Sequence, residues 1–303
     1  MNLNFKEFCN TIQEDLKETL GNNYSLEIHQ IRKNNNLNLQ GLTIRKNGCN
    51  LSPTFYLDYY YEDYQDGKSL EVIKEKILEA YRVNTPDKSV SLSFFTNWET
   101  AKNKIAYKLV NYEMNKELLK DIPHYCFLDM AIVFFYLLEE NGGTTATILI
   151  HNHHMMFWNV SLDKLYSVAF KNTPLLLNYE IRGITEVLNI NRMAGTLEAP
   201  DILDAPEATD EYLYVLTNKS KLYGAGCILY KNILKDFADK KQCDLYILPS
   251  SVHEVLLVPT KMGMPNQDLT AMVREVNATQ VLKEEILSDH VYYYSRETGL
   301  ITM

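Results

Sequence analysis

The stretch of this chain that most limits its possible folds is residues 244–260, with the sequence DLYILPSSVHEVLLVPT. It contains two continuous apolar runs, at 245–248 and 255–258, which are separated by a short turn that begins at Pro249. Continuous apolar runs of this length are typical of strands that are buried on both faces. The sequence therefore predicts a β-hairpin at the centre of a sheet.

Periodicity in the rest of the chain predicts an α+β fold with largely antiparallel sheets and with helices packed on one face. The predicted strands come in pairs joined by short turns, a pattern that disfavours parallel βαβ connections. Residues 1–84 are expected to form an N-terminal αββαα domain. Its elements are a helix at 3–20, a hairpin of strands at 24–32 and 37–45, a helix that begins at Ser52-Pro53 and contains TFYLDYYYEDY, and a helix capped by Ser69.

The order of predicted elements in the remainder indicates two ββαββα units, which would be an old internal duplication. Each unit opens with two strands, and the interval from Asn97 to Asn111 equals that from Asn218 to Asn232. Residue identity between the units is slight, so a coincidence between two α+β layers is the alternative. The opening strands are predicted at 90–95 and 105–111 in the first unit, and at 212–216 and 225–230 in the second. Further predicted elements are a strand at 146–158 and helices at 178–188 and 268–287.

These units are expected to be a middle unit at 85–194 and a C-terminal unit at 211–303, joined by a linker at 195–210. The linker is acidic, contains proline and lacks aromatic residues. Between Glu198 and Glu211 there are six acidic residues and no lysine or arginine. This composition predicts an exposed, mobile connection.

The overall composition is ordinary for a soluble globular protein, with 46% hydrophobic and 23% charged residues. A formal net charge of −9 argues against nucleic acid and against an anionic membrane surface as partners. The longest apolar stretch, at 130–138, is too short to span a bilayer. Five scattered cysteines without a CxxC motif, and a start without a secretory signal, predict reduced thiols in the cytoplasm.

Several stretches together carry a resemblance to a known family. They are LDMAIVFFYLL, NTPLLLNYEIRGITEVL, YVLTNKSKLYGAGCILY, DLYILPSSVHEVLLVP, REVNATQV and SDHVYYY. With them, nearly the whole chain resembles an uncharacterised family of Clostridia and relatives, domain of unknown function 5688. The resemblance implies a bacterial, cytosolic protein, and it brings no activity, cofactor or catalytic residue.

One candidate site lies in the turn of the central hairpin, where Ser250, Ser251, His253 and Glu254 offer a hydroxyl, a base and a carboxylate. On a strand, His253 and Glu254 would point to opposite faces, so Glu254 could not orient the imidazole. Ser251 and His253 would share a face but stand too far apart to hydrogen-bond, unless the turn folds them together. We therefore predict no catalytic residue, keep these four as candidate binding residues, and expect a local hydrogen bond to hold His253.

The other candidate is the histidine cluster of His151, His153 and His154. If residues 146–158 form one strand, His151 and His153 share a face, whereas a tight turn at Asn152-His153 would place His151 beside His154. Either way two imidazoles are close, but a zinc site needs three or four ligands and no third stands at ligand spacing. The three histidines are thus candidate metal ligands without a predicted metal, and a polar loop is the alternative.

The leading functional hypothesis is a non-enzymatic binding or regulatory module with protein partners. The 21 tyrosines and the abundant sheet edge suit strand addition or a flat protein interface. Two alternatives remain open: a hydrolase with a site near Ser251 and His253, and a metal-dependent enzyme that uses His151 and a neighbouring histidine. No cofactor is implied.

Overall fold

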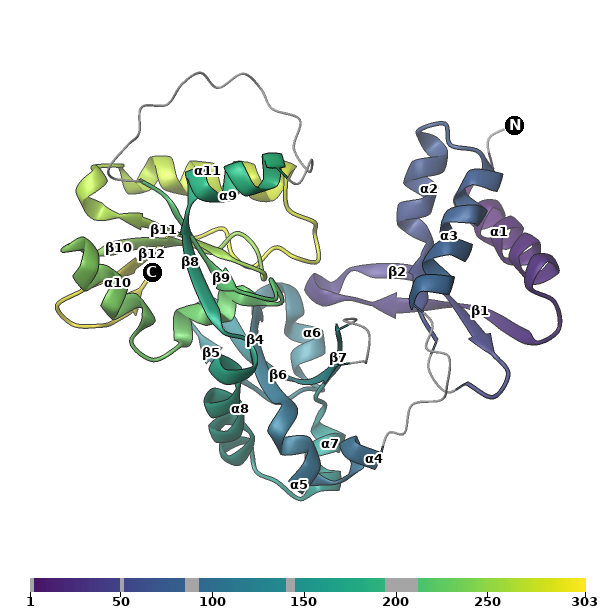
Figure 1. The fold of residues 1–303 in the computed structure, drawn as a ribbon, viewed down its shortest axis with the longest axis horizontal. Coiled ribbons are helices and arrows are strands. Elements are labelled where there is room, and N and C mark those ends of the chain that lie inside the picture. Colours follow the sequence, from purple (N-terminus) through teal and green to yellow (C-terminus); the bar gives the residue numbers. More distant parts are fainter. Residues whose placement is uncertain (1–2, 50–51, 85–92, 140–144, 194–211) are drawn as a thin grey trace. The chain divides into compact units, whose positions relative to one another are not determined.

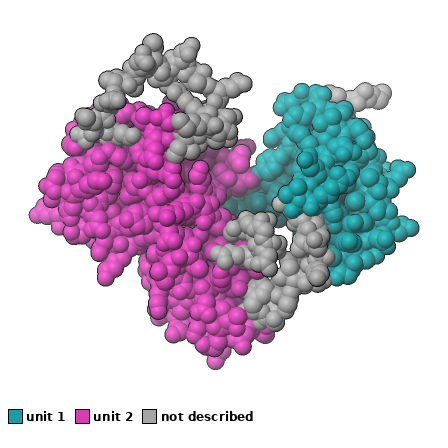
Figure 2. Space-filling view, in the orientation of Figure 1, with its two compact units in different colours: residues 1–95, 141–144 teal, residues 96–140, 145–303 magenta. Residues whose placement is uncertain are grey.

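The computed structural model describes residues 3–49, 52–84, 93–139, 145–193 and 212–303 (Figure 1). It divides into two compact units, which Figure 2 shows in different colours. Unit 1 comprises residues 1–95 and 141–144, and unit 2 comprises residues 96–140 and 145–303. The predicted linker at 195–210 lies outside the described residues. Within the described ranges, no helix has both the length and the apolar character needed to cross a bilayer.

Unit 1 packs helices against a three-stranded antiparallel sheet with the strand order β1-β2-β3. The elements are α1 (Phe5–Leu20), β1 (Tyr24–Arg32), β2 (Asn38–Lys46), β3 (Thr54–Tyr56), α2 (Leu57–Gln65) and α3 (Leu70–Asn84). The predicted order needs one correction, because the helix expected to contain all of TFYLDYYYEDY begins at Leu57. The first three residues of that stretch, a threonine and two aromatics, form β3 instead, since such residues pack well against a neighbouring strand.

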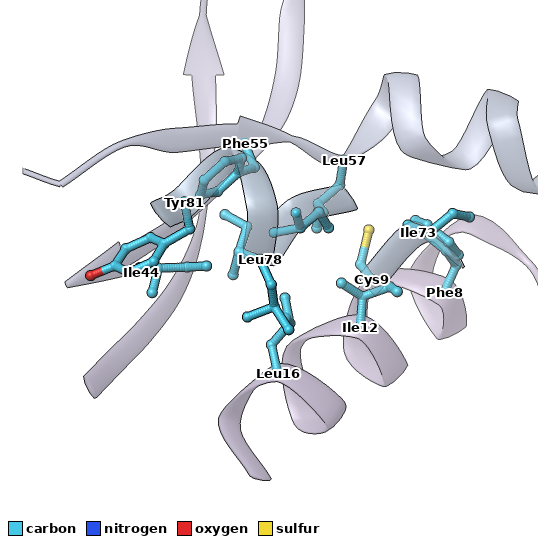
Figure 3. Packing of buried hydrophobic residues seen from close by; sticks show 12 residues of the cluster. Phe8, Cys9, Ile12, Leu16, Ile44, Phe55, Leu57, Ile73, Leu78 and Tyr81 are labelled. Atoms are coloured by element: carbon cyan, nitrogen blue, oxygen red, sulfur yellow. The ribbon is translucent and has the colours of Figure 1, made fainter. Parts of the chain in front are cut away.

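The core of unit 1 is a continuous cluster of apolar side chains (Figure 3). Helix α1 contributes Phe8, Ile12 and Leu16, which recur at helical spacing and are fully buried. Asn4 caps this helix by accepting a hydrogen bond from the Glu7 amide. In Figure 3 the side chains of α1 point toward those of β2, β3 and α3, so one apolar face of each element closes the core.

Unit 2 contains two antiparallel sheets. The four-stranded sheet consists of β4 (Ile105–Asn111), β5 (His124–Phe127), β6 (Met130–Glu139) and β7 (Thr145–Leu149). The six-stranded sheet has the order β13-β12-β10-β11-β9-β8, formed by β8 (Tyr179–Gly183), β9 (Tyr214–Asn218), β10 (Leu245–Leu248), β11 (Val255–Pro259), β12 (Tyr292–Tyr294) and β13 (Ile301–Thr302). Helix α4 (Ser93–Thr96) spans the boundary between the two units. The helices of unit 2 are α5 (Trp98–Ala101), α6 (Lys116–Leu119), α7 (Asn152–Trp158), α8 (Leu162–Leu176), α9 (Ile184–Met193), α10 (Ile233–Lys241) and α11 (Asn266–Thr279).

The predicted central hairpin is confirmed. Strands β10 and β11 pair with each other and are flanked by β12 and β9. Leu245, Ile247 and Leu257 are buried, as expected for strands that lie between two neighbours. The α+β class and the antiparallel pairing are confirmed with it.

The predicted ββαββα order is not found in the described residues. The segment expected to be a strand at 225–230 forms a 3₁₀ helix, Gly224–Leu229. At Gly224 a Cβ atom would lie 2.2 Å from Thr217 Oγ1 and 2.4 Å from the His253 carbonyl oxygen. The backbone thus turns against its neighbours at a point where a side chain would not fit. In the predicted middle unit, residues 93–95 of the strand expected at 90–95 belong to helix α4, and residues 90–92 lie outside the described ranges.

Two further predictions of helix are corrected. The helix expected at 178–188 is strand β8 followed by helix α9, because Tyr179 and Ile181 alternate with Glu180 and Arg182. Strand β8 belongs to the predicted middle unit but pairs with β9 of the predicted C-terminal unit. The helix expected at 268–287 ends at Thr279 as α11.

A polar cluster ties the turn between β5 and β6 to the strand β12. The carboxylate of Asp129 accepts hydrogen bonds from Ser288 Oγ at 2.7 Å and from the hydroxyl of Tyr292, and it lies 2.9 Å from His290 Nδ1. Burial would raise the pKa of Asp129, but these contacts together hold it below its ordinary value. Since β6 and β12 lie in different sheets, this Asp129 cluster joins the two sheets of unit 2.

Candidate functional site

A pocket of about 640 Å³ lies over one face of β8, β9 and β11. The antiparallel register sets Glu180 opposite Thr217 and Arg182 opposite Val215, so these four side chains share that face. We call it the polar pocket, and its lining consists of Glu180, Arg182, Val187, Val215, Thr217, Lys219, Lys221, Glu254 and Leu256. Its volume is within the range of sites that bind small molecules.

The charges of the polar pocket are unevenly paired. The Arg182 guanidinium lies 2.9 Å from a carboxylate oxygen of Glu180 and 3.7 Å from one of Glu186. In the described part of the chain, Lys219 and Lys221 form no ion pair within 4.0 Å, although the positive charge of Lys221 acts to lower the pKa of Glu254. Two ammonium groups are therefore available to a ligand.

Glu254 stands out among the carboxylates of this pocket. Burial raises its pKa above the ordinary value, and the nearby Glu285 adds to this effect. His253, the Ser251 hydroxyl and Lys221 act in the opposite direction, but the net direction is upward. The fold thus disfavours the charged form of Glu254 relative to that of an exposed carboxylate.

A second hollow, of about 340 Å³, lies on the opposite face of β8, against helix α10. We call it the aromatic groove, and it is lined by Tyr179, Ile181, Gly183, Tyr214, Ile233, Asp236, Phe237, Lys240 and Lys241. The Lys241 ammonium lies over the Tyr214 ring, 4.3 Å from its centroid, and the Tyr214 and Phe237 rings meet edge to face. This side of β8 therefore offers a surface on which aromatic rings lie beside charged side chains.

Strand β8 separates the two hollows and is an edge strand among the described residues. The amide of Lys219 donates to the carbonyl of Asn178, and the amide of Ile184 donates to that of Leu213. Antiparallel pairs alternate between hydrogen-bonded and non-hydrogen-bonded, so the even-numbered residues of β8 bond to β9. The backbone N–H and C=O groups of Tyr179, Ile181 and Gly183 consequently point away from β9, toward the free edge.

The four candidates in the central hairpin divide between two environments. They lie in the loop before β11, not on the strand, because β11 begins at Val255. Ser251 is buried, and its Oγ accepts a hydrogen bond from the backbone amide of His253, not from the imidazole. Glu254 lines the polar pocket, whereas Ser250 is not among the residues that line it.

The imidazole of His253 is held away from Ser251. Its Nδ1 lies 3.0 Å from the carbonyl oxygen of Lys221, its Nε2 lies 3.5 Å from a carboxylate oxygen of Glu285, and its ring stacks on Tyr223. The imidazole is therefore held by residues distant in the sequence, and not by the local hydrogen bond that was expected. A serine–histidine pair of the kind that activates a nucleophile is not formed by these two residues.

The three histidines of the other candidate do come together, but not on a strand. Strand β7 ends at Leu149, and His153 and His154 lie in the first turn of α7, which His151 precedes. His154 Nδ1 accepts the backbone amide of His151, which favours a helix start over a continued strand. The His153 and His154 ring centroids are 3.9 Å apart. Within the described ranges, no group of three or more His, Cys, Asp or Glu side chains is arranged to hold a metal ion.

The sequence matches the model of a family of unknown function, DUF5688, over residues 5–296. The chain belongs to this family. Comparison with curated proteins and with solved structures finds no match. Membership in DUF5688 confirms the resemblance drawn from the sequence, and it assigns no activity to the two hollows beside β8.

Sequence reasoning missed β8 and with it most of the site. The signal was present in NYEIRG, where apolar and charged residues alternate with period two. The helical spacing of the following ITEVL, which belongs to α9, favoured a helix over the whole stretch instead. Of the four candidates in the hairpin, Glu254 is the one that lines the polar pocket.

Proposed function

We propose that this chain is a binding module that takes an extended segment of a protein partner alongside β8. The observation that carries the proposal is the edge strand β8 with a hollow on each of its faces. When an extended peptide adds to a sheet edge, main-chain hydrogen bonds provide affinity and pockets for alternate side chains provide specificity. Strand β8 offers both features.

The surroundings of β8 support this proposal. The outward backbone groups of Tyr179, Ile181 and Gly183 could pair with an added antiparallel strand. Tyr179 is 45% exposed, and Leu175, just before it in the chain, is 69% exposed. Large apolar side chains that stay exposed beside a free strand edge are typical of interaction sites.

We also propose that the protein works in the bacterial cytoplasm, which its five disulfide-free cysteines support. The hydrolase alternative has less support, because the His253 ring contacts Lys221 and Glu285, not the Ser251 hydroxyl. A metal enzyme that uses His151 and its neighbours has less support too, because the Nδ1 atom of His154 accepts a hydrogen bond from the backbone amide of His151.

A proline substitution at the outward edge tests the proposal. Random twelve-residue peptides displayed on phage would be selected on the whole protein and then measured against Ile181→Pro. This change removes an outward N–H group and spares the bonds to β9, as edge strands tolerate. The matched control is Ile301→Pro, which removes an outward N–H group from β13 at the other edge of the same sheet.

We expect selected peptides to bind the Ile301→Pro variant as they bind the original chain, and to bind Ile181→Pro at least about tenfold more weakly. They should also slow amide exchange at Tyr179, Ile181 and Gly183 in the unsubstituted chain, a readout that does not depend on the variant folding. Equal binding to both variants, or protection away from β8, or no selected peptide, would overturn the proposal.

A further inference from the structure

The lining of the polar pocket carries three positive side chains, Arg182, Lys219 and Lys221, and two carboxylates, Glu180 and Glu254. Arg182 is engaged by Glu180 and Glu186, while Lys219 and Lys221 lack an ion-pair partner in the described part of the chain. Both lysines are exposed and follow the end of β9, where they line the pocket. A bound group that brings negative charge here would gain charge-assisted hydrogen bonds that no residue of the pocket makes.

The floor of the same pocket is apolar. Val215, Leu256 and Val187 contribute to it from β9, β11 and α9. The lining of the pocket thus combines apolar side chains with positively charged ones. A carboxylate on a short methylene stem, as in glutamate or aspartate, matches both parts, because its stem can pack on the floor while its charge stays at the rim.

Glu254 does not cancel this preference. Burial raises the pKa of Glu254, so its charged form is less favoured here than that of an exposed carboxylate. An incoming carboxylate would raise this pKa further, because like charges disfavour joint ionisation. A positively charged ligand side chain would instead meet Lys219 and Lys221.

The register of β8 decides which residues of a bound segment reach this pocket. In an added antiparallel strand, residues opposite Glu180 and Arg182 share the face of the polar pocket. Residues opposite Tyr179, Ile181 and Gly183 share the face of the aromatic groove. Alternate residues of the segment therefore face the polar pocket and the aromatic groove.

We infer that the polar pocket selects an acidic side chain, so that the preferred partner segment alternates acidic residues with apolar ones. This inference rests on the proposed function, because it assumes strand addition at β8. The apolar residues of the segment face Tyr179, Ile181 and Phe237 in the aromatic groove. The acidic residues face Lys219 and Lys221.

Three synthetic probes test this preference. They are fluorescein-labelled seven-residue peptides in which valine alternates with glutamate, glutamine or lysine. Binding to the whole protein is measured by fluorescence polarisation, for the original chain, for Lys219→Gln with Lys221→Gln, and for Ile181→Pro. The charge-matched control is Lys164→Gln with Lys231→Gln, because both of these lysines are exposed and lie outside the pocket lining.

We expect the glutamate peptide to bind about tenfold more tightly than the glutamine peptide, and the lysine peptide to bind most weakly. The Lys219 and Lys221 double variant should lose this difference, and the control double variant should keep it. If the glutamate and glutamine peptides bind equally and Ile181→Pro weakens both, the inference is wrong and the proposed function stands. If Ile181→Pro weakens neither peptide, or neither binds, the proposed function fails and the inference fails with it.

Discussion

The core of unit 1 and the Asp129 cluster of unit 2 are stabilised in different ways. The core of unit 1 is one continuous apolar cluster, in which side chains such as Phe8, Ile12 and Leu16 are fully buried. Unit 2 also buries many apolar side chains, such as Phe134 and Ile247, and its two sheets are joined in addition by the part-buried polar contacts of the Asp129 cluster. An apolar core depends on volume and shape, whereas a polar cluster depends on each donor having its acceptor. The core of unit 1 and the Asp129 cluster should therefore respond to different substitutions.

The largest effect is expected in unit 1. Leu16→Ala should lower the free energy of unfolding of this unit by about 2–5 kcal/mol, because it removes a fully buried side chain from a well-packed core. Urea denaturation followed by hydrogen exchange in peptides from each unit would measure the loss separately. Val72→Ala is the control, since Val72 is 48% exposed and should change stability by less than about 0.5 kcal/mol. A loss below about 1 kcal/mol at Leu16 would contradict the assignment of the core.

A smaller effect is expected in unit 2 from Asp129→Asn. The substitution keeps the shape of the side chain but removes the charge that Ser288 and Tyr292 donate to, which should cost about 1–3 kcal/mol. The same denaturation experiment, read from unit 2 peptides, would measure it. Asp163→Asn serves as the control, because Asp163 also accepts from a tyrosine, Tyr125, but does so at the surface. If both variants lose the same stability, the polar cluster is no more important than a surface contact.

The smallest effect is a pH dependence confined to unit 2. Burial, His153 and His151 lower the pKa of His154 to about 4 in the folded chain, from the ordinary 6.5. In acid the unfolded chain binds this proton first, so stability should be lost as the pH falls from about 6.5 toward 4. His154→Asn can keep the hydrogen bond to the His151 amide without titrating. Unfolding free energies between pH 7 and 4.5 should fall less steeply in this variant, and parallel curves would show that His154 does not contribute.

The same contrast explains what the sequence could predict. The helix α1 and the hairpin β10–β11 were predictable, because apolar side chains such as Ile12 and Ile247 repeat with the period of their element. The Asp129 cluster was not, since its partners lie about 160 positions further along the chain and single polar residues have no period. Gly224 was misassigned for a related reason, because its conformation follows from the distant Thr217 and His253 carbonyl.

The candidate site was predictable in part. The hairpin turn drew attention to Glu254, which lines the polar pocket, and the antiparallel edges suggested strand addition. The sequence could not place Lys219 and Arg182 beside Glu254, because that neighbourhood depends on the strand order β11-β9-β8. Strand order is set by long-range packing, which local periodicity does not report.

The position of β12 has a consequence for how the protein is made. Strand β10 pairs with β12 on one side, and β12 lies about 45 residues later in the chain. At synthesis rates of about 5–20 residues per second, β10 leaves the ribosome about 2–9 s before this partner does. During that interval its apolar edge can pair with other chains, whereas α1, β1 and β2 of unit 1 are already complete. Misassembly during translation should therefore begin in unit 2.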